Sequence, residues 1–263
     1  MLRASDQEVF DAIRYLDCTP DISDTTQPEV AIAIEGSRDH YWITEDGALI
    51  GEVGTAKAVV EALHVHLFRR SIEERPQTAL LHAACLRRGD RRLLVVGSKG
   101  AGKTTLALRL IAAGYDIEGD EHVFIEDSIV IARPRGCRVK AAALPLLGEM
   151  TKVVAQAPSY TDEKLGTIFN VDPRMLGGTW RIDRGRADAV IVLQPNHGGL
   201  SSIRSLPPMA VVQSLMPEAG LRETGRGAAI AAIAAMVGRA KGFQLLLGDH
   251  PGALRCIESA LVA

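Results

Sequence analysis

The sequence lacks several features that would mark whole classes of protein. It has no run of about 18 apolar residues, and its N-terminal stretch lacks the apolar core of a signal peptide, so we expect neither a membrane span nor export. With 30 basic and 32 acidic residues the net charge is −2, which leaves no basic excess for nucleic acid. We therefore expect a cytoplasmic protein that binds neither nucleic acid nor membrane.

Cysteine is also scarce. The four cysteines are scattered along the chain and form no C-x-x-C pair; they are Cys18, Cys85, Cys137 and Cys256. This spacing argues against a zinc site and gives no support for a disulfide framework. Isolated buried thiols are the simpler interpretation.

What the chain does have is enough length and apolar content for a substantial core. With 263 residues, 47% of them hydrophobic, it can form one α/β domain or a principal domain with a smaller one. A helix is predicted over residues 6–17, strands over 30–35, 40–44 and 48–53, and a second helix over 55–71. Residues 1–75 are therefore a predicted N-terminal α+β subdomain, and residues 76–263 the principal domain.

One stretch carries a specific chemistry. The apolar run 93–96 has the character of a strand buried on both faces, and residues 97–104 then match G-x-x-x-x-G-K-[ST] at every fixed position before a helical pattern begins. Such a loop turns its backbone N–H groups toward a polyphosphate at a helix N-terminus. The predicted nucleotide-binding residues are Gly97, Ser98, Lys99, Gly100, Ala101, Gly102, Lys103, Thr104 and Thr105.

Two of these residues have individual roles in the motif. Lys103 is expected to reach the outer phosphates, and the Thr104 hydroxyl is expected to bind Mg²⁺. The motif alone thus predicts a nucleoside triphosphate with Mg²⁺ as the bound group.

Neighbouring segments offer candidates for the remaining chemistry. A strand over residues 78–86 carries His82, which is either a core histidine or an active-site group. A strand or strand pair over 115–125 carries Asp120 and Glu121, which are either a solvated acidic turn or the carboxylates that a P-loop enzyme needs for Mg²⁺ and for the acceptor's proton.

The rest of the chain is read more coarsely. Residues 156–180 are the best candidate for a mobile loop, and Arg181, Arg184 and Arg186 beyond it are either phosphate clamps or a charged turn in solvent. Further strands and helices follow. We predict strands over 187–193, 202–206 and 243–247, and helices over 208–215, 228–240 and 251–261.

Residues 80–123 together resemble the kinase core of the HPr kinase/phosphorylase superfamily. The matching features are His82-Ala83-Ala84 on a strand, the glycine loop starting fifteen residues after His82, and Gly114-Tyr115 followed by Gly119-Asp120-Glu121. The resemblance implies an α/β fold with a P-loop-containing mixed sheet flanked by helices, like that of HPr kinase and phosphoenolpyruvate carboxykinase. It also implies ATP as the nucleotide, an active-site role for His82, and a catalytic or metal-linked role for Asp120.

The chain also departs from that family. Glu121 stands where the family has a second aspartate, the family's Glu-x-Arg-Gly segment is not found after Gly136, and the N-terminal subdomain is unlike theirs. It thus resembles divergent members such as the serine kinases of lasso-peptide pathways, and a homo-oligomer is left open.

The leading hypothesis is transfer of the γ-phosphoryl group of ATP to a serine hydroxyl of a peptide or small protein. The predicted catalytic residues are His82, Lys103, Asp120 and Glu121, with Thr104 and Asp120 as metal ligands and Asp120 or Glu121 as the base. The alternatives are a small-molecule kinase on the same core and a catalytically silent nucleotide-binding regulatory protein.

Overall fold

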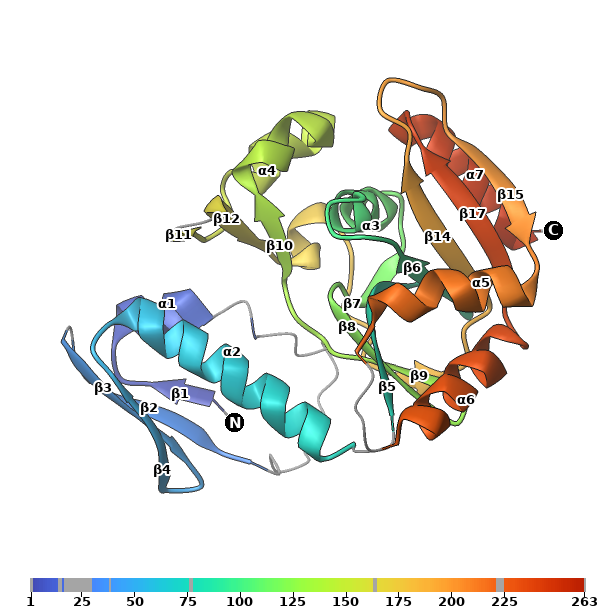
Figure 1. The fold of residues 1–263 in the computed structure, drawn as a ribbon. Coiled ribbons are helices and arrows are strands. Elements are labelled where there is room, and N and C mark those ends of the chain that lie inside the picture. Colours follow the sequence, from blue (N-terminus) through green and yellow to red (C-terminus); the bar gives the residue numbers. More distant parts are fainter. Residues whose placement is uncertain are drawn as a thin grey trace.

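Three sheets flanked by helices make up the computed structural model, which describes residues 2–13, 16, 30–37, 39–75, 78–162, 165–220 and 225–262 (Figure 1). One of them is a ten-stranded mixed sheet. No helix within these ranges is long and apolar enough to cross a membrane. The predicted fold class, a P-loop-containing mixed sheet flanked by helices with a small N-terminal α+β subdomain, is confirmed.

The N-terminal sheet has the order β1-β2-β3-β4, and its helices cover one face (Figure 1). Alternate residues of β2 and β3, among them Ile34 and Ile43, are buried with Val59 and Leu63 of α2. The three predicted strands are present and form an antiparallel meander, whereas the parallel strand β1 beside β2 was not anticipated. The elements are β1 (Leu2–Ala4), α1 (Gln7–Ile13), β2 (Ile32–Ser37), β3 (His40–Glu45), β4 (Ala48–Val53) and α2 (Ala56–Glu73).

The large sheet runs β13-β9-β8-β5-β6-β14-β17-β15, and both β7 and β16 also pair with β5. Strands β6, β14 and β17 are parallel, and β15, which lies within the strand predicted over 202–206, is antiparallel at the edge. The strands are β5 (Ala79–Arg88), β6 (Arg91–Val96), β7 (Asp116–Gly119), β8 (His122–Glu126), β9 (Ile129–Ala132), β13 (Arg184–Gly185), β14 (Ala189–Pro195), β15 (Ser202–Leu206), β16 (Ala219–Gly220) and β17 (Lys241–Leu247).

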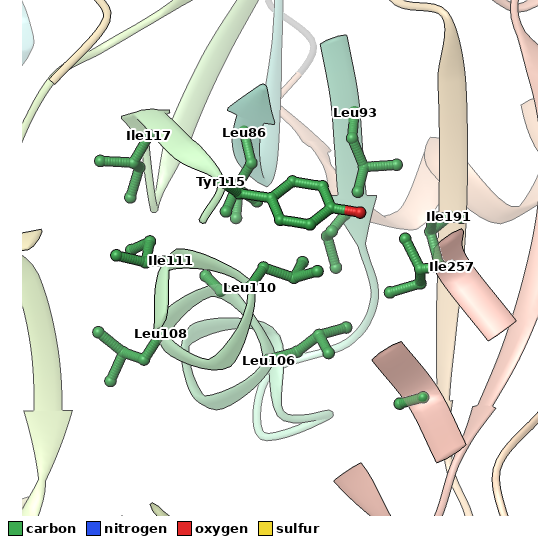
Figure 2. Close-up of a cluster of buried hydrophobic side chains, with 14 of the residues drawn as sticks. Leu86, Leu93, Leu106, Leu108, Leu110, Ile111, Tyr115, Ile117, Ile191 and Ile257 are labelled. Atoms are coloured by element: carbon green, nitrogen blue, oxygen red, sulfur yellow. The ribbon is translucent and has the colours of Figure 1, made fainter. Parts of the chain in front are cut away.

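Helices cover both faces of this sheet. Leu93 and Val95 of β6 pack toward α3 (Lys103–Ala112) and α7 (His250–Val262), whereas Leu94 and Val96 pack toward α5 (Pro208–Leu215) and α6 (Arg226–Val237). Figure 2 shows side chains of α3 next to those of the sheet, with Ile257 of α7 beside Ile191. The continuous apolar character of the β6 segment therefore reflects burial on both faces.

A smaller three-stranded antiparallel sheet follows β9, with the order β10-β12-β11. The expectation of a mobile loop over residues 156–180 is wrong, because β11 and β12 form a hairpin whose Ile168 and Val171 are buried. Its strands are too short for the alternation to stand out from the polar residues between them. The elements are β10 (Cys137–Lys140), η2 (Ala141–Met150), α4 (Thr151–Val154), β11 (Ser159–Asp162), β12 (Gly166–Val171) and η3 (Pro173–Leu176).

Two further local features concern the cysteines and Gly114. Cys85 and Cys137 are buried thiols, as predicted, whereas Cys256 is only partly buried. Gly114 follows the C-cap of α3 with a φ of 87°, a left-handed conformation that glycine adopts without strain. Cys18 and the C-terminal end predicted for the first helix lie outside the described residues.

Candidate active site

The glycine-rich loop joins the end of β6 to the start of α3. Gly100 and Gly102 have φ values of 86° and 98°, which residues with a Cβ rarely adopt. Within the described part of the chain no side chain caps the N-terminus of α3, so the N–H groups of its first turn remain available to an anion. The loop therefore has the geometry expected of a phosphate-binding site.

Lys103 lies inside this loop and is 6% exposed. Its Nζ donates hydrogen bonds to the carbonyl oxygens of Gly97, at 2.6 Å, and Ser98, at 3.2 Å. Burial lowers the pKa of Lys103, while Glu218, Asp120 and Glu121 oppose that shift. The ammonium group is thus held by two loop carbonyls, and three carboxylates are near enough to raise its pKa.

Strand β5 brings the loop and the acidic pair together. Its residue Ala83 stands opposite Val96 of β6, the last residue before the loop, and its backbone N–H donates to the carbonyl of Glu121 at 3.2 Å. Both β7 and β8 pair with β5, and Asp120 and Glu121 form the junction between them. The histidine strand, the loop and the acidic pair therefore converge on one end of the sheet.

Asp120 is a buried carboxylic acid next to the loop. It is 9% exposed, and burial raises its pKa to about 7, although a hydrogen-bonding contact with the Thr104 hydroxyl and the charge of Arg135 oppose the shift. Among the described residues nothing hydrogen-bonds to its Oδ1. A buried carboxylate with an unpartnered oxygen is costly unless it serves a cation or a proton.

Glu121 has a different environment from its neighbour. Burial disfavours its ionised form, but an ion pair with the Arg135 guanidinium and the nearby His122 outweigh that effect and lower its pKa. Glu121 is therefore ionised and paired, whereas Asp120, with its pKa of about 7, is partly protonated at neutral pH.

His82 faces a second carboxylate that the sequence pattern did not reveal. Its Nδ1 lies 3.8 Å from Oε2 of Glu218, in the short helix η4 (Met216–Glu218). Burial and the charge of Lys103 lower the pKa of His82 despite Glu121 and Glu218, so the ring is neutral near pH 7. Both side chains line a cavity of about 290 Å³, with Leu80, Glu121, His122 and Gly220.

The structure places the other predicted residues as follows. Thr104 lies in the first turn of α3 in contact with Asp120, and Thr105 is buried. The arginines after residue 180 lie at the opposite end of β6, because Arg181 donates to the carbonyl of Gly89 in the β5–β6 turn at 2.9 Å. They do not belong to the loop's surroundings, and the phosphate-clamp alternative is wrong.

The donor set around Asp120 fits Mg²⁺. A carboxylate oxygen without a partner and a threonine hydroxyl are hard oxygen ligands, and Mg²⁺ prefers one or two such protein ligands together with phosphate oxygens. The adjacent loop and helix N-terminus suit the phosphates themselves. Thr104 and Asp120 would thus hold the cation between protein and nucleotide.

Comparison with known proteins adds little. No family model and no curated protein matches the chain. It is similar to a solved structure of the Hpr(Ser) kinase/phosphatase from Coxiella burnetii, at 13% identity and a TM-score of 0.35, covering 70% of this chain and 96% of that one. At that TM-score the similarity does not indicate a function. The function is therefore inferred from the site itself.

Proposed function

We propose that this chain is an ATP-dependent kinase that transfers the γ-phosphoryl group to a serine hydroxyl of a peptide or small protein. The observation that carries the proposal is the placement of Asp120, a buried carboxylic acid with a pKa of about 7 and an unpartnered Oδ1, in contact with Thr104 at the glycine-rich loop. Such an acid can accept a proton as well as hold a cation, and nucleotide binding alone requires no proton acceptor.

Each residue has a role in this proposal. The loop N–H groups and the Lys103 ammonium hold the β- and γ-phosphates, where they stabilise the charge that develops during transfer. Thr104 and one Asp120 oxygen would hold Mg²⁺, which would neutralise phosphate charge. The other Asp120 oxygen accepts the proton of the acceptor hydroxyl.

His82 and Glu121 act beside this centre. The neutral His82 ring borders the cavity next to Lys103 and orients the acceptor or the transferring phosphate. Glu121, tied to Arg135, holds the acidic junction in position and is the weaker candidate for the base. We assign this chemistry to residues 76–263, with residues 1–75 as an accessory subdomain.

The experiment that tests the proposal measures label transfer from γ-labelled ATP with Mg²⁺ to a library of serine-containing peptides. Replacing Lys103 with Ala removes the charge that faces the phosphates, so transfer is expected to fall by about 100-fold or more. The matched control is Lys152→Ala, since Lys152 is exposed on α4. Peptides with threonine or tyrosine in place of serine test the acceptor.

Two results would count against the proposal. Transfer that survives Lys103→Ala in a folded protein would remove Lys103 from the mechanism. Calorimetric binding of ATP without transfer to any peptide would favour a regulatory nucleotide-binding protein instead.

A further inference from the structure

A second cavity lies where the N-terminal subdomain meets the small sheet. It has a volume of about 460 Å³, which is in the range of ligand-binding sites, and its walls come from α1, α2, β10, β11 and β12. Its charged lining residues are four acids, Glu8, Asp11, Glu61 and Asp162, and three bases, Lys57, Arg135 and Arg138.

Arg135 joins this cavity to the candidate active site. The side chain is buried, forms the ion pair with Glu121 and lies 3.4 Å, Nη1 to Nδ1, from His64 of α2. Its charge also acts on the carboxyl group of Asp120. One side chain therefore separates the inner end of the cavity from the proposed catalytic acids.

The interior of the cavity is basic, because Arg135 is buried and Arg138 partly buried, whereas three of the four acids of its lining are exposed and outnumber the exposed Lys57 at the mouth. Arg138 lies over the ring of Tyr160, at 5.5 Å, and donates to its hydroxyl, so both arginines are held in place. Burial and the charge of Arg135 lower the pKa of His64 to about 4, so this ring adds no charge. The four carboxylates come from three elements: Glu8 and Asp11 from α1, Glu61 from α2 and Asp162 from β11.

We propose that this cavity binds the peptide acceptor and selects one with a lysine or arginine close to the hydroxyl-bearing residue. The basic side chain contacts the acidic mouth, and the two interior arginines repel it from the inner end, so the polarity of the cavity sets the direction of the peptide. The carboxylates stand on three elements around the opening, which suits an extended chain better than a compact metabolite. The role as acceptor site rests on the proposed function; the preference for a basic peptide rests on the cavity alone.

The experiment measures binding before transfer. Fluorescence anisotropy with a library of labelled serine peptides, each carrying Lys, Asp or Ala at positions flanking the serine, is expected to show preferential binding of the Lys peptides, weakening with added salt. The double variant Asp11→Lys with Glu61→Lys reverses two exposed charges, so it should bind those peptides about tenfold more weakly and favour the Asp peptides. Glu35→Lys is the matched control, because Glu35 is exposed on β2 in the same subdomain and does not line the cavity.

The outcomes separate this inference from the kinase proposal. Wild-type protein that binds no library peptide above background, or that binds all equally, overturns the inference, as does a double variant that behaves like Glu35→Lys. Selective binding of Lys peptides that are never phosphorylated contradicts the kinase proposal and leaves the cavity assignment standing. Transfer to peptides irrespective of flanking charge supports the kinase and removes the proposed selectivity.

Discussion

Glu118 and Asp120 are buried acids two positions apart, yet their surroundings are opposite. Glu118, at the centre of β7, accepts hydrogen bonds from Nε and Nη2 of Arg92 at 2.7 and 2.9 Å, and from the Cys85 thiol at 3.0 Å. Asp120, just beyond the end of β7, has the Thr104 hydroxyl beside it and an oxygen that no described residue satisfies. Burial alone therefore does not distinguish a structural acid from a functional one.

The difference lies in what the rest of the chain supplies at each position. Two arginines of neighbouring strands, Arg87 and Arg92, converge on Glu118, so its charge is neutralised inside the protein. Asp120 opens instead toward the glycine-rich loop, where a cation and phosphates can complete its coordination. A complete set of partners indicates a structural role, and an incomplete set beside an anion-binding loop indicates a functional one.

The largest effect is expected when the structural acid is removed. Glu118→Ala leaves the buried guanidinium of Arg92 with only the more distant Asp183, at 3.9 Å, as a counter-charge, so the free energy of unfolding should fall by about 3–5 kcal/mol, measured by urea denaturation. Arg92→Met combined with Glu118→Leu removes both charges and should recover most of that loss. A single variant as stable as the wild type would show that this pair does not hold the sheet together.

Removing the functional acid is expected to have the opposite profile. Asp120→Asn eliminates the proton acceptor, so phosphoryl transfer should fall by roughly 10²–10⁴-fold, while stability at neutral pH stays the same or rises because a poorly solvated carboxylate is gone. Label transfer and urea denaturation on the same preparation separate the two effects. Glu121→Gln is the paired variant: a larger loss of kcat there than in Asp120→Asn would make Glu121 the base.

Sequence patterns predicted the order of most elements and the glycine-rich loop. The motif of residues 97–104 depends on glycines and on a lysine at fixed spacing, and the helix over residues 208–215 shows its proline start and apolar face directly. Local patterns of this kind describe what a segment does by itself. They also placed His82 on a strand beside that of the loop, since a tight turn joins the two, and Asp120 in the segment that follows the loop's helix.

Two residues of the site could not be found in that way. Glu218 reaches His82 because β16 pairs with β5, and Arg135 reaches Glu121 from the link between β9 and β10. Both contacts depend on long-range pairing, which no local periodicity records. The contrast between Glu118 and Asp120 could not be predicted for the same reason, because the partners of Glu118 come from β5 and β6 rather than from its own strand.

The most sensitive test of the comparison is the pH dependence of stability. Burial raises the pKa of Asp120 from 3.8 to about 7, so between these values the folded protein binds more protons than the unfolded chain. Stability must then decrease as pH rises through this window, at a slope of up to about 1.4 kcal/mol per pH unit, and level off above it. Asp120→Asn lacks this titration, so the difference between wild-type and variant free energies of unfolding isolates it. If the difference in free energy of unfolding stays constant from pH 4 to 8, Asp120 is no less satisfied than Glu118. Mg²⁺ with ATP favours the ionised carboxylate, so adding them should flatten the dependence of stability on pH.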